Sequence, residues 1–385
     1  MTHTLPRDRG TWLAYLLLAF YGYCLNSLGP LTPFLKSDLQ LSYTVSSLHF
    51  TAFAAGMLGV GLAGHRLIGR IGRWPSLWLG AGGRSLGLLL LALGRTPVIT
   101  VGAAFLMGLV GSLILALADR HGELRAVALS EANVVASLVS TAAPLLVGWF
   151  ARSALGWRPA LGLVALAPVL LYLGLRPGPA APASGPQTDP LPGQRLPGLF
   201  WVYWAGLVLA VSVEFCMVFW SADFLENVVG LPKADAAQAV SLFFGAMILG
   251  RLAGSRLVQR FSAPAVVGGS LLIAALGFLV FWQAGSAPLA LGGLFCVGLG
   301  VASLYPLILS LAIGAAGDDT VQASARATLA SGAAISSLPL VLGRLADAVG
   351  IQAAYGVVAL LLAGVFLVAQ SASRLARRSP SVSGG

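Results

Sequence analysis

Charged side chains are scarce in this sequence. Only 9% of its 385 residues are Asp, Glu, Lys or Arg, whereas 57% are apolar. Soluble domains usually carry about 25% charged residues, so a water-soluble protein of this length could not cover its surface with so few. The composition therefore excludes a soluble domain and indicates an integral membrane protein.

Cysteine and histidine are also rare. The three cysteines, Cys24, Cys216 and Cys296, all fall within apolar runs, which favours buried small side chains over a disulfide framework. The four histidines are scattered and form no metal-site spacing. The sequence also lacks a phosphate-binding loop of the Walker type and a Gly-x-Ser-x-Gly nucleophile elbow. We therefore expect no cofactor, no bound metal and no enzymatic activity.

The formal net charge of +10 comes from basic residues in short clusters between apolar runs. A nucleic-acid-binding protein would need a continuous basic patch, so nucleic acid is not expected as a partner. In membrane proteins, Lys and Arg gather in cytoplasmic segments. With both termini cytoplasmic, the inside segments hold Arg7, Arg9, Arg66, Arg70, Arg73, Arg120, Arg125, Arg176, Arg195, Arg256, Arg260, Arg374, Arg377 and Arg378, and the outside segments only Lys36, Arg95, Arg152, Arg158 and Lys233.

Long apolar runs dominate the chain. A helix needs roughly 20 apolar residues to span a hydrocarbon core of about 30 Å. Twelve runs of that length predict an all-α polytopic membrane protein with twelve transmembrane helices. These runs are 11–34, 43–65, 74–93, 96–118, 125–151, 156–175, 199–225, 236–257, 264–284, 288–315, 323–347 and 350–372.

The chain consists of two similar halves. Pro33–Leu67 aligns without a gap on Asp223–Leu257, which defines the main repeat register, and Ala132–Gly148 aligns on Ala327–Gly343 in a slightly shifted register. Between the halves, Arg176–Gly198 contains seven prolines and four glycines, a composition typical of an extended linker. The predicted organisation is a six-helix half at 1–175, a cytoplasmic linker at 176–198, a second six-helix half at 199–372 and a cytoplasmic tail at 373–385.

Two parallel six-helix repeats joined in this way resemble the major facilitator superfamily. The family's loop between its second and third helices reads Gly-x-Leu-x-Asp-Arg-x-Gly-Arg-(Lys/Arg)-x-x-Leu. Here His65–Leu77 keeps Leu67, the Arg-x-Gly-Arg and the closing Leu77, while His65 replaces the first Gly and Gly69 the acid. The resemblance implies a conformational loop made of Arg66, Arg70, Gly72 and Arg73.

The same resemblance implies secondary transport of a small organic solute by alternating access. A remnant of the antiporter signature, Ala143–Gly148, favours export, whereas Tyr305-Pro306 and Gly250–Leu257 also resemble uptake branches for sugars or organic acids. A sensor or assembly partner that transports nothing is the alternative of another class. We expect a monomer in a bacterial-type inner membrane, whose partners are the solute, the lipid bilayer, and protons or another cation.

Acidic residues within spans are candidates for proton coupling, because a charge in the membrane is costly. Glu214 lies about 22 Å into the seventh span, at 1.5 Å per residue. We predict that it carries the proton or binds a cation, with a structural hydrogen-bonded carboxylate as the alternative. Asp223, near the outer end of the same span, is the second candidate, although a solvated surface position is the expected alternative.

Further charges within the spans suggest a gate. Glu131 and Arg251 are predicted to pair across the two halves at the inner side, with Arg326 at the same rim. The alternative is that each charge holds a loop within its own half. Arg84 lies in the middle of the third span and needs a partner that the sequence does not name. Because third helices of the family face lipid, we expect a packing role for Arg84.

Polar and aromatic residues on apolar spans are candidates for the substrate cavity. Tyr15, Gly22 and Asn26 follow a spacing of i, i+7 and i+11, which places them on one helix face. Pro306 predicts a kink in the tenth span. Packing is the alternative for aromatic residues in such positions. The remaining cavity candidates are Asn133, Trp220, Tyr305 and Thr328.

Overall fold

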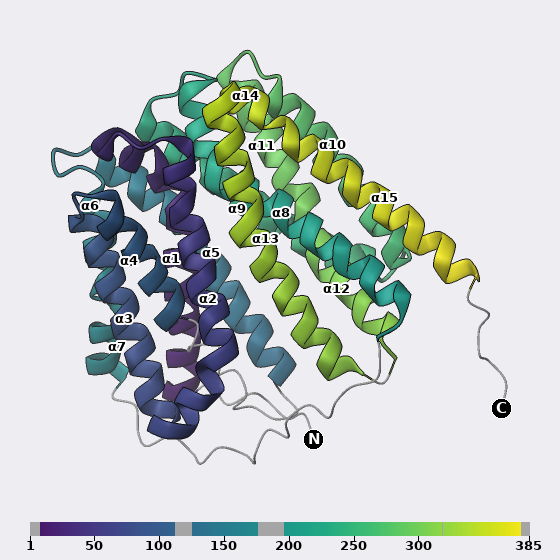
Figure 1. Cartoon of the computed structure of the whole chain (residues 1–385), viewed down its shortest axis with the longest axis horizontal. Coiled ribbons are helices and arrows are strands. Elements are labelled where there is room, and N and C mark those ends of the chain that lie inside the picture. Colours follow the sequence, from purple (N-terminus) through teal and green to yellow (C-terminus); the bar gives the residue numbers. More distant parts are fainter. Residues whose placement is uncertain (1–7, 112–124, 176–195, 318, 379–385) are drawn as a thin grey trace. The chain divides into compact units, whose positions relative to one another are not determined.

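The computed structural model of the chain is helical throughout the part that it describes, residues 8–111, 125–175, 196–317 and 319–378 (Figure 1). Within these residues the helices are α1 (Arg9–Leu39), α2 (Tyr43–Ile71), α3 (Arg73–Leu93), α4 (Pro97–Gly111), α5 (Arg125–Ala151), α6 (Arg158–Ala165), α7 (Ala167–Leu175), α8 (Gly198–Asn227), α9 (Lys233–Leu257), α10 (Ala263–Trp282), α11 (Ala287–Val301), α12 (Leu304–Ala315), α13 (Thr320–Val349), α14 (Ile351–Ala354) and α15 (Gly356–Arg378).

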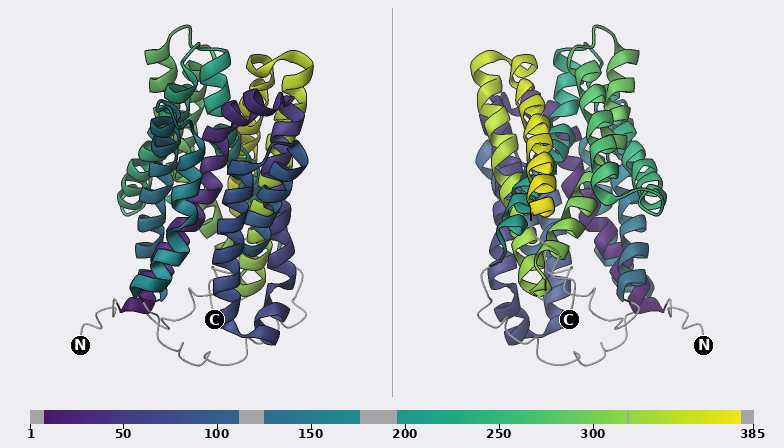
Figure 2. Two further views of the ribbon diagram at one scale, coloured as in Figure 1. Left: turned by 90° about the vertical axis from the view of Figure 1, so that its left-hand side faces the viewer. Right: turned by 90° about the vertical axis from the view of Figure 1, so that its right-hand side faces the viewer.

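The length and composition of these helices suit a membrane. Ten segments of the described chain are long and apolar enough to cross a bilayer, and Pro97–Gly108 is a shorter apolar helix. A helix satisfies its own backbone hydrogen bonds, which a hydrocarbon medium requires of a spanning segment. The two further views show long helices linked by short connections (Figure 2). The predicted all-α polytopic fold is confirmed.

Three predicted spans are each divided into two helices. The run 156–175 breaks at Leu166, and the run 288–315 breaks at Ala302 and Ser303. Proline explains both breaks, because its ring clashes with the carbonyl group four residues earlier and it has no N–H to donate. Pro168 follows the first break and Pro306 the second, so the predicted kink in the tenth span is present. The run 350–372 breaks at Tyr355, and its second helix continues to Arg378.

The chain forms two compact units. Unit 1 consists of Met1–Gln187 together with Phe219–Asn227 and Leu231–Ser241. Unit 2 consists of Thr188–Val218, Val228–Gly230 and Leu242–Gly385. The C-terminal end of α8 and the N-terminal part of α9 thus belong to the same unit as α1–α7.

The internal repeat extends from the sequence to the packing of the helices. In unit 1, a Cβ atom added to Gly108 of α4 would overlap the carbonyl oxygen of Phe53 on α2. In unit 2, a Cβ atom added to Gly298 of α11 would lie 2.5 Å from the carbonyl oxygen of Phe243 on α9. The main repeat register places Gly108 on Gly298 and Phe53 on Phe243. Small residues at equivalent places therefore let equivalent helices approach closely.

Two further features repeat in the same register. Added Cβ atoms at Gly87 and Gly277 would meet the backbone nitrogens of Met107 at 3.3 Å and of Val297 at 2.7 Å. The turn after α1 also has its counterpart after α8, because Gln40 (φ 51°) and Gly230 (φ 81°) both adopt positive φ values. The internal repeat is thus a repeat of helix contacts and turns, and not of residue types alone.

We predict that Gly108→Ala and Gly298→Ala each destabilise the protein, because the facing backbone oxygens can move only with their helices. Overpacking of this kind typically costs about 1–3 kcal/mol. Gly102→Ala and Gly292→Ala are matched controls, because the main repeat register also pairs these two glycines and an added Cβ would meet nothing within 4 Å. Thermal unfolding in detergent checks the prediction, and equal midpoints for the two pairs of variants would contradict it.

Candidate functional site

A row of polar contacts joins α1 to α5 within unit 1. The hydroxyl group of Tyr15 donates to Oε2 of Glu131 at 3.1 Å. Two turns further along α1, an added Cβ at Gly22 would lie 2.5 Å from Oγ of Ser140. Nδ2 of Asn26 donates to that same Oγ at 3.0 Å. Tyr15, Gly22 and Asn26 therefore do share one face of α1, as their spacing predicts, and this face packs on α5. Their role in a substrate cavity stays a prediction.

Arg84 on α3 is completely buried in unit 1. Its guanidinium carbon lies 4.5 Å from the ring centroid of Tyr21 and 5.9 Å from that of Phe20, both on α1. None of its three guanidinium nitrogens has a hydrogen-bond partner among the described residues. Arg84 therefore packs on α1, as the packing role expected for it requires, whereas Leu86 on the same helix is 51% exposed. The aromatic faces of α1 supply the electrostatic stabilisation.

Lys36 and Asp223 form an ion pair inside unit 1. Nζ of Lys36 at the end of α1 lies 2.8 Å from Oδ1 of Asp223 near the end of α8. The Asp223 side chain is 0% exposed and that of Lys36 is 17% exposed. Lys36 also lies 3.3 Å above the ring of Tyr43 on α2. The solvated position expected for Asp223 is wrong, because α1 and α2 cover this end of α8.

A cluster of aromatic rings extends from Tyr43, whose ring lies under Lys36. Phe50 of α2 stacks on Phe219 of α8 with their centroids 4.0 Å apart and their planes 4° from parallel. Trp220 of α8 meets Phe50 edge to face at 5.6 Å and lies 5.7 Å from the ring of Tyr43. Trp220 is completely buried by these contacts. Low exposure to water strengthens the attraction between Lys36 and Asp223.

A polar pocket lies beside this ion pair, also within unit 1. It encloses about 770 Å³ of empty volume, including its open mouth. Oδ2 of Asp223 is buried and has no hydrogen-bond partner in the described part of the chain. At the more exposed side of the pocket, Nζ of Lys233 lies 3.6 Å from Oε1 of Glu226. The charged residues that line the pocket are Lys36, Asp223, Glu226 and Lys233.

A second polar contact joins α5 to the start of α9 within unit 1. Arg152, just after α5, donates to Oδ1 of Asp235 and, at 2.6 Å, to Oε1 of Gln238. Gln238 in turn donates to the carbonyl oxygen of Leu145 at 3.3 Å. Gly148 gives this contact its space, because an added Cβ would overlap Cγ of Gln238. Polar contacts within unit 1 therefore involve the C-terminal end of α8, through Asp223, and the N-terminal part of α9, through Gln238.

Glu214 and Arg251 belong to unit 2. Glu214 lies on α8 and is half-buried, whereas Arg251 on α9 is exposed. The positive charge of Arg251 acts favourably on the carboxylate of Glu214. Arg251 therefore has a carboxylate within electrostatic reach inside its own unit. Its predicted pairing with Glu131 stays a prediction.

The remaining predicted cavity and gate residues can each be described within their own unit. In unit 2, Tyr305 is half-buried near the start of α12, and Thr328 on α13 donates to the carbonyl oxygen of Ser324 at 3.1 Å. Arg326 has an exposed side chain, and its backbone carbonyl accepts from Nε1 of Trp204 at 2.8 Å. In unit 1, Asn133 is exposed on α5.

The predicted conformational loop lies between α2 and α3. Arg70 is exposed in the last turn of α2, and Gly72 takes a φ of 86° before α3 starts at Arg73. This φ explains the glycine, because residues with a Cβ atom rarely adopt it. The side chains of Arg66 and Arg73 lie outside the described part of the structure.

The profile of the Major Facilitator Superfamily matches residues 11–336. The chain belongs to this superfamily. An uncharacterised MFS-type transporter of Yersinia pestis is 28% identical over 379 residues, which cover 93% of this chain and 94% of that protein. A glucose/galactose transporter of Brucella abortus is 27% identical over 370 residues, 88% of each chain.

Solved structures of the superfamily share the fold of this chain. The crystal structure of a bacterial homologue of the human lysosomal transporter Spinster, in an inward-facing and occupied conformation, superposes with a TM-score of 0.74. The two sequences are 14% identical, and the alignment covers 96% of this chain and 98% of that one. The similarity supports the twelve-helix fold that the spans predict.

Lys36 is a candidate site residue that the sequence analysis uses only as a charge on an outside segment. The repeat contains a signal for it, because Lys36 aligns with Glu226 in the main repeat register. Equivalent helix ends thus carry opposite charges, and α1 and α8 present them in the same pocket. Complementary charges at equivalent positions could have identified this place as a contact.

We predict that Lys36→Met lowers the thermal stability of the protein strongly. The variant leaves the buried Asp223 without its cation, and breaking one side of a buried ion pair typically costs about 3–5 kcal/mol. Lys233→Met is the matched control, since its longer and more exposed contact with Glu226 is worth about 0–1 kcal/mol. The double variant Lys36→Met/Asp223→Leu should recover much of the loss. Equal unfolding midpoints for Lys36→Met and Lys233→Met in detergent would contradict the prediction.

Proposed function

We propose that the protein is a secondary transporter that moves a small organic solute across a bacterial-type inner membrane by alternating access, coupled to protons. Membership of the Major Facilitator Superfamily supports the transport role and argues against an enzyme. The observation that carries the proposal is the buried Lys36–Asp223 ion pair, which joins the ends of α1 and α8. Such a contact suits a gate because the attraction between the two charges is strong where water is excluded and weak where water enters.

The proposed gate is at the outer face, where the arginine distribution puts the ends of α1 and α8. The halves that would move are residues 1–175 and 199–372, joined by the linker 176–198, with both termini cytoplasmic. The Lys36–Asp223 pair, the ring stack of Phe50 on Phe219 and the Arg152–Asp235 pair would close this face. Opening it would admit more water to the pair, which already lines the adjoining pocket.

Two carboxylates are proposed for proton coupling. Glu214 is half-buried on α8 and within reach of the charge of Arg251. A proton on Glu214 removes its attraction for Arg251 and so changes the charge of this part of unit 2. Asp223 lies nine residues further along the same helix, with one oxygen bound to Lys36 and the other without a partner among the described residues. Protonation of Asp223 would weaken the outer gate directly.

The inner gate is proposed to involve Glu131, Arg251 and Arg326. The proposed substrate cavity is lined by Tyr15, Gly22, Asn26, Asn133, Trp220, Tyr305 and Thr328. Export remains the favoured direction, on the remnant of the antiporter signature at Ala143–Gly148. Sugar uptake is the second candidate, because the Brucella abortus relative is a glucose/galactose transporter. The protein is proposed to act as a monomer.

Proton movement in proteoliposomes tests this function. Purified protein is reconstituted with an internal pH dye and challenged with drugs, sugars including glucose and galactose, and organic acids. We predict a solute-dependent pH change for the wild type that falls at least about tenfold in Glu214→Gln, equivalent to about 1.4 kcal/mol. Glu226→Gln is the matched control, since Glu226 lies near the end of the same helix and is not one of the two carboxylates proposed for proton coupling.

Each result has a distinct meaning for the proposal. Equal signals from the wild type and Glu214→Gln would exclude Glu214 as the proton carrier and leave Asp223, tested by Asp223→Asn. Labelled solute that crosses without any pH change would contradict proton coupling but not transport. Binding of a solute with neither flux nor pH change would overturn the proposal in favour of a sensor.

A further inference from the structure

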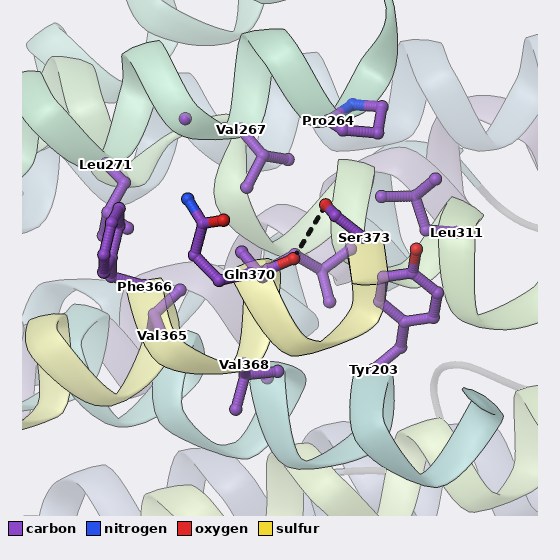
Figure 3. A pocket seen from close by; sticks show the side chains of 14 residues that line it. Tyr203, Pro264, Val267, Leu271, Leu311, Val365, Phe366, Val368, Gln370 and Ser373 are labelled. Carbon is purple, nitrogen blue, oxygen red and sulfur yellow. Dashed lines mark hydrogen bonds between the residues drawn. The ribbon is translucent and has the colours of Figure 1, made fainter. Parts of the chain in front are cut away.

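A second pocket lies entirely in unit 2, between α8, α10, α12 and α15 (Figure 3). It has about 600 Å³ of empty volume, including its mouth. Gly206 on α8 and Gly268 on α10 contribute to its space, since neither has a side chain. None of the residues assigned above to transport lines it. The pocket is thus a feature that the proposed transport function leaves unexplained.

The pocket is apolar at one end and polar at the other. Figure 3 shows Leu271 and Phe366 at one end, and Tyr203 and Ser373 at the opposite end. The polar end is near the helix termini, because Pro264 is the second residue of α10 and also lies there. From Pro264 to Leu271 the pocket extends about 10 Å along α10, at 1.5 Å per residue.

Two polar side chains of the pocket have no partner within the protein that the structure describes. The hydroxyl group of Tyr203 and the amide group of Gln370 make no hydrogen bond among these residues, whereas Ser373 donates to the carbonyl oxygen of Ala369 at 2.9 Å. Figure 3 shows the Gln370 side chain extending between α15 and Val267 of α10. Gln370 is exposed and Tyr203 is half-buried, so both groups are accessible to a molecule that enters the pocket. Oxygen atoms of a ligand would satisfy both donors.

The surroundings of the pocket indicate which ligand reaches it. Leu272 on α10 and Phe366 and Leu367 on α15 are all exposed, at 60%, 51% and 64%. In a membrane-spanning protein such surfaces face lipid, so the medium around this part of unit 2 consists of acyl chains. At the polar end, exposed Arg374 follows Ser373 directly, and exposed Arg260 lies four residues before Pro264. Exposed cations at this level of a bilayer attract anionic headgroups.

We propose that this pocket binds one anionic phospholipid from the adjoining leaflet, the cytoplasmic one under the predicted topology. One acyl chain lies along the apolar end, between Leu271 and Phe366. The ester oxygens accept hydrogen bonds from Tyr203 and Gln370, and the phosphate faces Arg260 and Arg374. Because lipid tails and apolar side chains are similarly hydrophobic, the selectivity comes from the polar end. The proposal does not depend on transport.

Photolabelling in liposomes tests the proposal with a matched pair of variants. An added Cβ at either Gly268 or its neighbour Gly269 would meet nothing within 4 Å, but only Gly268 lines the pocket. Gly268→Leu therefore fills the pocket, while Gly269→Leu adds the same side chain outside it. The probe is phosphatidylglycerol with a photoreactive diazirine in one acyl chain, and mass spectrometry locates the label on the full-length protein.

The expected result is labelling of α10 and α15 in the wild type and in Gly269→Leu, with a decrease of about fivefold or more in Gly268→Leu, equivalent to about 1 kcal/mol. No labelling of α10 or α15 in the wild type, or equal labelling of the three proteins, would overturn the proposal. Should Gly268→Leu fail to elute as a folded protein, Gln370→Leu takes its place, with the same expected decrease.

Competition tests the polar end separately. Unlabelled phosphatidylglycerol should displace the probe from the wild type better than phosphatidylcholine does. The exposed double variant Arg260→Gln/Arg374→Gln should lose this preference. Equal displacement by the two lipids in the wild type would overturn the assignment of an anionic headgroup.

Discussion

A charge inside a membrane must be stabilised where it lies, and this constraint governs several charged residues of the described spans. Asp223 meets Lys36, Glu131 accepts from Tyr15, and Arg84 lies on the ring of Tyr21. Each of these contacts joins two helices that are far apart in sequence or separated by a third. The charged side chains thus make specific contacts between helices. Apolar helices also associate through the complementary shape of their surfaces.

Shape complementarity supplies the other contacts, and glycine provides it at equivalent places in both units. The approaches at Gly108 and Gly298 are so close that even a methyl group would overlap the facing backbone. Between lipid tails and apolar side chains there is little hydrophobic difference, so close packing of this kind is what associates transmembrane helices. The internal repeat makes the two units similar, while the charges make them different: Arg84 aligns with the buried Ala274.

Much of the fold could be predicted from the sequence because each span is a local property of the chain. The run 125–151 coincides with α5, and Pro306 indicates the break before α12. The shared face of Tyr15, Gly22 and Asn26 also follows from local helical geometry. The same pattern predicts a cavity face for these three residues, but it does not show that this face packs on α5.

The contacts of the candidate site could not be predicted with the same ease, because they join distant segments. Lys36 and Asp223 are 187 residues apart, and neither lies in a motif of the superfamily. A position near the end of a span suggests exposure to water, but the ends of α1 and α2 and the rings around Trp220 exclude water from Asp223. Burial of Arg84 likewise depends on which face α3 presents to α1, and hydropathy does not encode that choice.

We propose that the ends of α1 and α8 separate during transport and that the Lys36–Asp223 pair opposes this separation. Spin labels are attached at Gln40 and Asn227, which both line the pocket beside the pair. Double electron–electron resonance then measures the distance between the two labels. We expect one short distance in the wild type and a second, longer population in Lys36→Met, because the closed state loses its ion pair. Lys233→Met should resemble the wild type. Identical distance distributions in the wild type and Lys36→Met, with and without solute, would contradict the claim.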